Sequence, residues 1–358
     1  DVSEVSGASR VVVAMSGGVD SSVTAALLSE QGFDVVGVTL RLWDGPEAGR
    51  CCGMDDTADA FEVADRLGIP FHVLDYADAF RADVVAPFVQ EYLHGRTPNP
   101  CARCNQHIKF DRLLREARTL GADYLATGHY ARLERERVGV RMRTGRDPGK
   151  DQSYFLATTA AKDLAGVLFP LGEYTKDGVR ELAEGYGLVT AGKAESQDIC
   201  FVPGKAADFV ASHGSGPTLE PGPIEDRNGK RLGTHRGAPF YTVGQRRGLG
   251  LTADRPLYVV AVDAEANRVI VGGADEVFSF ALAVGEVSWL AGAPAGRAFE
   301  AAVKLRYAAP AVPARVIPGE AGARVELAEP VRAVTPGQVA AFYYGDEVLG
   351  GGWIAEAA

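Results

Sequence analysis

The sequence predicts an α/β domain built on a parallel sheet, followed by two small β-rich domains. Over roughly the first 200 residues, short apolar runs alternate with segments of helical spacing. Strands that alternate with helices form parallel sheets covered on both faces. After about Gly204 the chain changes to short β-like runs between turns, and residues 212–222 are rich in Gly, Pro and Ser. At about 100–200 residues per domain, we expect domains at 1–210, 211–275 and 276–358.

The elements of the first domain follow from apolar periodicity. Residues 10–15 (RVVVAM) form a short apolar run typical of a buried strand. Residues 21–31 place Val23, Ala26 and Leu27 on one helical face, and Gly32 suits the C-terminal cap. Further strands are expected at 34–42, 69–75 and 123–127, and further helices at 55–67, 78–93 and 107–120. In the β-rich part, strands are expected at 257–263, 268–271, 299–307, 323–327 and 339–344.

Composition limits the class of protein. A hydrophobic fraction of 46% and a charged fraction of 23% are those of a soluble globular protein. No apolar run approaches the roughly 20 residues that a membrane span needs, so we expect no membrane partner. The net charge of −10 argues against coating nucleic acid through bulk charge, but it leaves room for local basic patches. The odd number of cysteines predicts a reducing compartment, the cytoplasm.

The sharpest motif is Ser16-Gly17-Gly18-Val19-Asp20-Ser21-Ser22, between the first expected strand and helix. Two glycines let backbone N–H groups approach an anion, and the helix N-terminus adds donors and partial positive charge. The string is neither a Walker loop nor a dinucleotide fingerprint. It resembles the SGGxDS loop of ATP pyrophosphatases, which split ATP between its α and β phosphates and adenylate a carbonyl oxygen. The alternative is a plain strand–turn–helix corner.

The cysteines are the second set of candidate reactive groups. Cys101 and Cys104 form a CxxC pair in a loop that carries Pro98 and Pro100. We expect Cys104 just before the helix at 107–120, whose N-terminal field lowers the pKa of a thiol. Cys200 lies 96 residues later (200 − 104), in the string SQDICFV.

These cysteines have other interpretations. A CxxC pair is often half of a zinc site, which His107 or His129 would have to complete, because no second CxxC is present. Cys200 could be an inert buried thiol. Cys51 and Cys52 are interpreted as inert, because no chemistry in the sequence uses them.

Six strings stand in a fixed order along the chain. After the SGGVDSS loop come TPNPCxxCNxxIKF, ATGHYAR (126–132), KDQSYFL (150–156), SQDICFV (196–202) and FYTVGQRRGLG (240–250). In this order they resemble the tRNA-specific 2-thiouridylase (MnmA) family, from about Arg10 to about Trp353. The resemblance implies a PP-loop nucleotide domain, of the adenine nucleotide α hydrolase type, followed by two small β-rich domains.

The resemblance also implies a reaction and its partners. ATP, with Mg²⁺, would adenylate O2 of the wobble uridine in tRNAs for Lys, Glu and Gln. A persulfide on Cys200 would supply sulfur to C2 with loss of AMP. Cys104 would be the nucleophile that attacks the persulfide, either releasing sulfide or forming a disulfide with Cys200. A cysteine desulfurase or a persulfide relay protein would donate the sulfur. A monomer that binds one tRNA is the simplest expectation.

The resemblance also implies binding roles for single residues. The ATP-binding positions would be Ala14, Met15, Ser16, Gly17, Gly18, Val19, Asp20, Ser21, Leu40 and Gly128. The tRNA-contacting positions would be Asn99, Pro100, Cys101, His129, Lys150, Asp151, Gln152, Arg306, Tyr307 and Gln338, of which Asn99–Cys101 would lie near the target base. No resident metal ligand is predicted.

One position departs from the family pattern. Many members have Asp-x-x-Cys where this chain has Cys101-x-x-Cys104, so no aspartate role can be assigned here. The departure opens an alternative in which Cys101, Cys104 and Cys200 hold a [4Fe–4S] cluster with one open iron site, because three thiolates suffice for three irons. We rank the persulfide first.

Two segments are rich in basic residues. Residues 226–255 hold seven Lys and Arg against two acids, and residues 131–150 hold seven against three. Each could face RNA or be a solvated surface. For 131–150 the two interpretations are equally favoured, whereas at Gln245–Gly248 the adjacent Arg246 and Arg247 beside glycine favour RNA. An unstacked loop base is expected to be extruded into the catalytic cleft.

Two other functions fit parts of the sequence. A small-molecule enzyme with the same loop, such as an amidotransferase-type synthetase or argininosuccinate synthase, would not need Cys104 or Cys200. A non-catalytic RNA-binding protein with a relic nucleotide fold would tolerate loss of Asp20 and Ser21.

Overall fold

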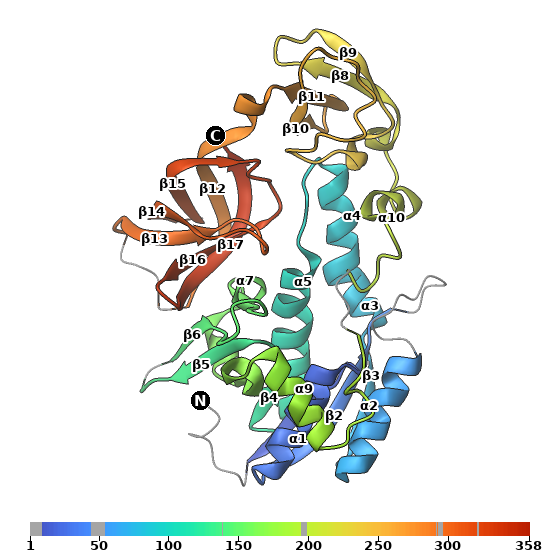
Figure 1. The fold of residues 1–358 in the computed structure, drawn as a ribbon, viewed down its shortest axis with the longest axis vertical. Helices are drawn as coiled ribbons and strands as arrows, with labels where there is room; N and C mark the ends of the chain where they lie inside the picture. Colours follow the sequence, from blue (N-terminus) through green and yellow to red (C-terminus); the bar gives the residue numbers. More distant parts are fainter. Residues whose placement is uncertain are drawn as a thin grey trace.

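The computed structural model describes residues 9–43, 54–137, 139–194, 199–290, 292, 296–320 and 322–358. Cys51, Cys52 and residues 195–198 of the SQDICFV string lie outside this set, so the interpretation of Cys51 and Cys52 stays a prediction. An α/β part, a small β part and a β-barrel can be followed in Figure 1. The predicted fold class is confirmed.

The first sheet is parallel, as the alternation of strands and helices predicts. Its strand order is β3-β2-β1-β4-β7. In the central strand, Val11 and Val13 pack into one apolar cluster and Val12 into another, because successive side chains of a strand point to opposite faces. The strands are β1 (Arg10–Ala14), β2 (Asp34–Arg41), β3 (Phe71–Asp75), β4 (Tyr124–Ala126) and β7 (Val167–Leu168).

Helices cover both faces of this sheet. One cluster takes in Val23 of α1, Val63 of α2 and Val179 of α9, and the other takes in Phe88 of α4 and Ile108 of η3. The helices are α1 (Val19–Glu30), α2 (Met54–Leu67), α3 (Ala77–Phe80), η2 (Arg81–Val85), α4 (Ala86–Leu93), α5 (Pro100–Arg103), η3 (Cys104–Leu113), α6 (Leu114–Thr119), α7 (Ser153–Leu156), α8 (Ala161–Leu164), η4 (Pro170–Glu173), α9 (Lys176–Gly185) and α10 (Ala206–His213).

The helix that carries Cys104 begins earlier than predicted. Helices α5, η3 and α6 follow without a break from Pro100 to Thr119, whereas the predicted helix starts at 107. Asn99 caps the helix by accepting a hydrogen bond from the N–H of Ala102 at 3.1 Å, and proline is well suited to the first helical position. The prediction was wrong because Pro100 was interpreted as a helix breaker. Cys101 therefore lies in the first turn, and Cys104 lies inside the helix.

The middle part is a small mixed sheet in the order β10-β11-β8-β9, with Ile224, Val259, Val269 and Val271 in its core. Its helix α10 packs on α4 of the first part. The elements are η5 (Pro217–Leu219), β8 (Gly222–Asp226), β9 (Arg231–His235), η6 (Ala238–Phe240), β10 (Tyr258–Asp263), β11 (Arg268–Gly272) and η7 (Ala274–Val277).

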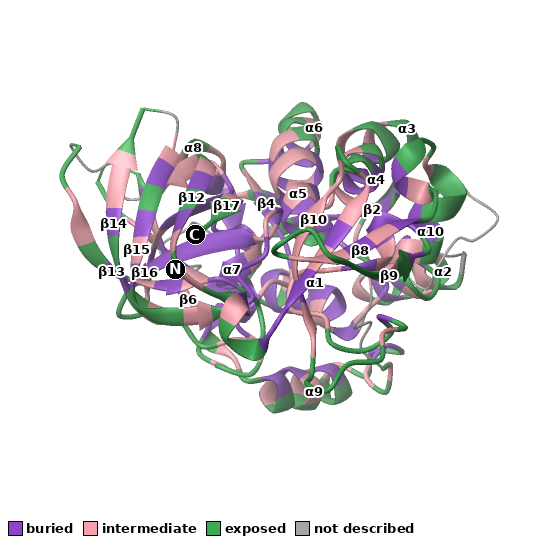
Figure 2. Ribbon diagram, turned by 90° about the horizontal axis from the view of Figure 1, so that it is seen from above, coloured by how far each residue is buried: buried purple, intermediate pink, exposed green. Residues whose placement is uncertain are grey.

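The C-terminal part is a barrel that the pairing of β12 with β17 closes. Figure 2 shows its strands alternating between buried and exposed residues, as expected for a barrel with a filled interior. Its strands are β12 (Phe278–Trp289), β13 (Phe299–Lys304), β14 (Val312–Gly319), β15 (Gly322–Arg332), β16 (Val339–Tyr344) and β17 (Glu347–Ala357).

A hairpin of the first part joins the barrel. Strands β5 (Ala131–Arg135) and β6 (Val140–Thr144) extend the barrel sheet, because β6 pairs with β17 at Glu347↔Arg143 and Val348↔Met142. The first and third parts thus share one sheet. The domain limits 1–210, 211–275 and 276–358 stay a prediction. Within the described residues, no helix is long and apolar enough to cross a membrane.

Candidate functional site

A cavity of about 250 Å³ opens where strands β1, β2 and β4 end. Ligands of open parallel sheets bind outside these carboxyl ends of the strands. We call it the loop cavity, because the SGGVDSS loop forms one of its walls. Its lining residues are Ala14, Met15, Ser16, Asp20, Ser21, Val38, Thr39, Leu40, Leu42, Asp56, Lys109, Thr127, Gly128, His129 and Gln152.

Hydrogen bonds within the SGGVDSS loop fix its conformation. The Ser21 hydroxyl accepts from the N–H of Ser16 at 3.1 Å and donates to the carbonyl of Gly18 at 3.1 Å. Gly17 has φ +71°, and a Cβ there would overlap the carbonyl of Asp56, so only glycine fits. Helix α1 starts directly after the loop, at Val19, and aims its N-terminus at this wall.

Two lysines are tied to carboxylates beside the loop. The ammonium group of Lys176 lies 2.8 Å and 2.9 Å from the two oxygens of Asp20, to which the hydroxyl of Tyr130 also donates at 2.7 Å. Lys193 donates to the carbonyl of Gly17 at 2.9 Å and to Asp56 at 2.6 Å. Neither lysine was among the candidate site residues predicted from the sequence.

His129 is neutral in the loop cavity. Its ring lies between Phe110 and Phe169, with centroids 5.7 Å from each, and its Nδ1 is 2.7 Å from the hydroxyl of Thr127. Burial, and secondly the charge of Lys109, hold the pKa of His129 well below its ordinary value. The imidazole therefore offers hydrogen bonds rather than charge to a ligand. The neighbouring Gly128 is also constrained, because a Cβ there would lie 2.9 Å from the backbone of Asp20.

The predicted catalytic cysteines lie next to the loop cavity rather than in its wall. Cys104 is 8% exposed and belongs to the apolar cluster that also contains Leu40 and Leu42 of the cavity wall. Cys200 is half-buried and packs against the same cluster, whereas Cys101 is exposed. The ring of Phe201, directly after Cys200, packs against Phe88 at 5.2 Å between centroids.

Helix α4 and its N-terminal extension connect these two cysteines. Phe201 contacts Phe80 and Phe88 along residues 77–93, and η2 of the same stretch packs on α5 and η3, which carry Cys101 and Cys104. Both cysteine-bearing segments are thus fixed on one helical support, although no wall of the loop cavity includes either thiol.

The barrel docks on the loop that leads to Asn99. The side-chain amide of Gln338 donates to the carbonyl of Thr97 at 2.8 Å, and the N–H of Thr97 donates to Pro336 at 2.9 Å. The buried Tyr154 donates its hydroxyl to the carbonyl of Val339 at 3.0 Å. The predicted tRNA position Gln338 therefore lies against the segment that starts the cysteine helix.

Two other predicted tRNA positions in the barrel also contact protein. The ring of Tyr307 packs on Phe155 at 4.5 Å between centroids, yet the side chain is 39% exposed. Arg306 is exposed and donates to the carbonyl of Ala333 and to the hydroxyl of Thr335.

The three residues of the Lys150-Asp151-Gln152 string have different surroundings. Asp151 is buried and accepts from the N–H groups of Gly145 and Ser153 at 3.0 Å and 3.1 Å, so its carboxylate is occupied within the protein. Gln152 lines the loop cavity, and Lys150 is half-buried. Asp151 therefore has a structural role. Gln152 is the residue of this string that a ligand in the loop cavity can reach.

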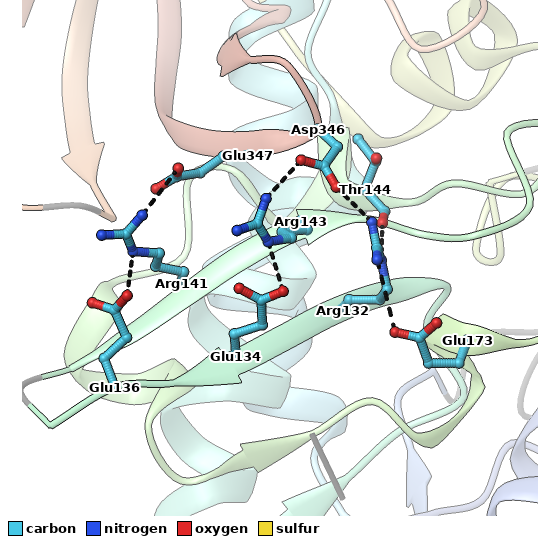
Figure 3. Close-up of polar contacts among 9 residues, drawn as sticks. All are labelled: Arg132, Glu134, Glu136, Arg141, Arg143, Thr144, Glu173, Asp346 and Glu347. Carbon is cyan, nitrogen blue, oxygen red and sulfur yellow. Dashed lines mark hydrogen bonds and ion pairs between the residues drawn. The ribbon is translucent and has the colours of Figure 1, made fainter.

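Three of the seven basic residues at 131–150 pair with acids. Figure 3 shows these three arginines reaching carboxylates on β5, β17 and the turns beside them. Arg143 lies 2.7 Å from Glu134 and 2.7 Å from Asp346. Arg132 lies 2.7 Å from Asp346, and Arg141 pairs with Glu136 at 2.6 Å. These contacts favour a structural role for the segment.

The basic segment at 226–255 is mixed, because Arg227 and Arg255 pair with Glu276 at its two ends. Arg246 and Arg247 are exposed, and no ion pair to either is present among the described residues. Arg236 packs over the ring of Phe240 at 3.9 Å. The string at 245–248 therefore presents guanidinium groups to solvent, as the RNA interpretation requires.

Several cavity residues were missed by sequence reasoning. Thr127 could have been found, because it directly follows the strand at 123–127 beside Gly128. Asp56, Lys176 and Lys193 lie 39 to 176 residues from the loop residues they touch, and nothing in the local sequence marks them. Lys109 was not among the candidate site residues.

A parallel sheet with a nucleotide-type loop, followed by two β domains, defines an ATP-using enzyme of the PP-loop class, and comparisons with known proteins name the family. Residues 9–204 match the model described as tRNA methyl transferase HUP domain, 207–273 the PRC-barrel domain of that name, and 279–354 the aminomethyltransferase beta-barrel domain. The tRNA-specific 2-thiouridylase MnmA of Magnetococcus marinus is 52% identical over 96% of this chain and 98% of its own length. That of Geobacter metallireducens is 52% identical over 96% of each chain. The chain belongs to the MnmA family.

A solved structure is more distantly similar. The U34-tRNA thiolase NcsA from Methanococcus maripaludis with its [4Fe-4S] cluster is 20% identical, with a TM-score of 0.36 over 56% of this chain and 63% of that chain. This likeness is too remote to bear on the function.

Proposed function

We propose that this chain is an ATP-dependent tRNA-uridine 2-sulfurtransferase. The observation that carries the proposal is the similarity of about 50% over nearly the whole length to proteins of that name. The described geometry supports it, because a nucleotide-type cavity and a cysteine-bearing helix share one core. Methyl transfer, which the name of the matching domains suggests, is less favoured, because an SGGVDSS loop suits cleavage of ATP rather than transfer of a methyl group.

The first half-reaction activates the uridine. O2 of the wobble uridine bonds to the α-phosphorus of ATP while the bond to the bridging oxygen breaks, and pyrophosphate leaves with that electron pair. The proton on N3 is released to solvent. The SGGVDSS loop and the N-terminus of α1 would hold the pyrophosphate, and Val38, Leu40 and Leu42 would flank the adenine.

ATP would bind with Mg²⁺. Asp20 offers carboxylate oxygens at the loop, the ligand type that Mg²⁺ prefers. This carboxylate pairs with Lys176, and Mg²⁺ would share it with that lysine.

The second half-reaction brings sulfur. The terminal sulfur of a Cys200 persulfide attacks C2, the C2–O2 bond breaks, and AMP leaves with the former O2. The thiolate of Cys104 then attacks Sγ of Cys200, and the bond between Sγ and the sulfur on C2 breaks with its electron pair on the C2 sulfur. A proton from solvent returns to N3, which gives 2-thiouridine and a Cys104–Cys200 disulfide. An external thiol reductant restores the enzyme. Because Cys104 is buried, binding of tRNA has to open the segment around Cys200 before this step.

Partners follow from this chemistry. We propose tRNAs for Lys, Glu and Gln as substrates, and a cysteine desulfurase or persulfide relay protein as the sulfur donor. Arg246, Arg247, Tyr307 and Gln152 would contact the tRNA, because each is accessible from solvent or from the loop cavity.

The [4Fe–4S] alternative is not favoured. Cys101 is exposed and Cys104 is buried, and no group of three potential ligands that includes these cysteines gathers within the described residues. A cluster needs three thiolates converging on one point.

Mass spectrometry of tRNA nucleosides tests the proposal. The chain is incubated with unmodified tRNA, Mg·ATP, a persulfide donor and dithiothreitol, and 2-thiouridine is quantified. Cys200→Ser and Cys104→Ser should reduce product to background, while Cys200→Ser still releases pyrophosphate.

Cys101→Ser is the matched control, because Cys101 is the exposed cysteine of the same helix. We expect it to retain most of the product. Full thiolation by Cys200→Ser would refute the persulfide role, and absence of product from the unaltered chain would refute the function.

A further inference from the structure

Lys109 joins the loop cavity to the cysteine helix. Its half-buried side chain lines the cavity together with Thr127, His129 and Gln152. It lies five residues after Cys104 in η3, a stretch of π-helix, and π-helical turns are frequent at functional sites. The helix that carries one reactive thiol thus also places a cation in the cavity wall.

The charge of Lys109 is not neutralised within the described part of the chain. No ion pair or hydrogen bond of its ammonium group is present there. Its charge is one of the causes, after burial, that lower the pKa of His129. The other two lysines beside the cavity are each committed: Lys176 to Asp20 and Lys193 to Asp56. Lys109 is therefore the excess cation among the described residues around a cavity that has to receive a polyanion.

Different walls of the loop cavity suit different parts of ATP. In the proposed function the SGGVDSS loop would hold the two terminal phosphates, and the apolar residues of β2 would flank the adenine. The α-phosphate lies between these two groups, so it has to face the remaining wall, which Lys109, His129 and Gln152 form. Because His129 is neutral, Lys109 supplies the charge of that wall.

We propose that Lys109 is a further catalytic residue of the reaction described above, whose ammonium group binds a non-bridging oxygen of the ATP α-phosphate. It stabilises the charge that builds on this phosphate as uridine O2 attacks and pyrophosphate departs. The same contact stabilises AMP when the C2–O2 bond breaks. No proton moves to or from Lys109 in either step. The inference rests on the proposed function.

Single-turnover release of pyrophosphate from Mg·ATP and tRNA measures the first step. Lys109→Gln should slow it about 10²–10³-fold, the usual cost of removing one group that stabilises transition-state charge. Lys109→Arg should recover at least about tenfold of this loss, because it keeps the charge. The affinity for tRNA without ATP should change less than about twofold.

The two diastereomers of ATPαS report the contact directly. The unaltered chain should prefer one diastereomer, because sulfur replaces the oxygen that Lys109 binds in the other, and Lys109→Gln should lose most of that preference. Arg112→Gln is the control: Arg112 lies three residues later on the same helix and pairs with Asp83. It should match the unaltered chain in both measurements.

Unchanged pyrophosphate release in Lys109→Gln would overturn the proposal. So would a loss that lies wholly in tRNA affinity with the diastereomer preference intact, because Lys109 would then be an RNA anchor. If Lys109→Gln fails to fold, Lys109→Ala decides: loss of the diastereomer preference supports the contact, and a retained preference refutes it. An unaltered chain that releases no pyrophosphate with tRNA would instead count against the proposed function.

Discussion

The two arginine-rich segments of this chain have similar composition, but the arginines of the β5–β6 hairpin and those of the loop after Thr242 have different surroundings. In the β5–β6 hairpin, Arg132, Arg141 and Arg143 all reach carboxylates, and Asp346 is shared by two of them. In the loop after Thr242, Arg246 and Arg247 point to solvent with no acid opposite them in the described residues. The first segment fixes one part of the molecule to another, and the second is available to a partner.

The difference arises from residues far away in the sequence. Asp346 lies 203 residues after Arg143, and the pairing of β6 with β17 brings the two together. A count of local charges cannot detect such a partner. Basic runs therefore indicate RNA binding only after the acids that the fold places opposite them have been considered.

The largest expected effect is on tRNA binding. We expect the double variant Arg246→Gln/Arg247→Gln to bind tRNA about 30-fold more weakly near physiological salt, because two phosphate contacts are lost. A plot of log affinity against log salt should become shallower by about two. Filter binding between 50 and 400 mM salt measures both quantities.

The matched control removes the same charge from the other segment. Arg141→Gln/Arg143→Gln should keep tRNA affinity within about threefold. Equal losses in the two double variants would contradict the division drawn between the segments.

The next effect is on stability. Asp346→Ala removes the carboxylate that Arg132 and Arg143 share, each at 2.7 Å. Because Asp346 is 47% exposed, solvent screens these pairs, and we expect the free energy of unfolding to fall by roughly 1–2 kcal/mol. Urea denaturation followed by circular dichroism measures the change.

Glu356→Ala serves as the comparison, because Glu356 is exposed on the same strand β17. It should change stability by less than about 0.5 kcal/mol. A loss as large as that of Asp346→Ala would mean that the shared carboxylate has no special role.

Local patterns predicted the parallel sheet and the loop well, because apolar runs and turn residues act over a few positions. The run RVVVA became β1, and the string after it supplies Ser16, Asp20 and Ser21 to the wall of the loop cavity. What could not be predicted depends on distant pairing. The β5–β6 hairpin was missed because its strands are charged on their exposed face and find their partner in β17.

The candidate site was predictable to a similar degree. Ser16, Leu40 and Gly128 line the cavity as the family resemblance implies. Lys176 and Lys193 reach the loop from helix α9 and the residues after it, and only the fold shows this. Asp151 looks like a surface contact in sequence, yet it is buried and fully hydrogen-bonded.

The smallest expected effect is the pH dependence of the β5–β6 network. Burial alone would raise the pKa of Asp346, but Arg143 and then Arg132 outweigh it, so the folded-state pKa lies below the ordinary value. A lowered carboxyl pKa stabilises the folded chain above the unfolded pKa of about 3.9, and this contribution is lost as pH falls through the folded value. We therefore expect the stability difference between the unaltered chain and Asp346→Asn to be constant from about pH 8 to pH 5. Below about pH 4 it should shrink, because the carboxylate takes up a proton and the arginines lose their partner. Urea unfolding at a series of pH values measures this difference. A difference that persists undiminished at pH 3 would show that packing of the side chain, rather than its charge, joins the hairpin to the barrel.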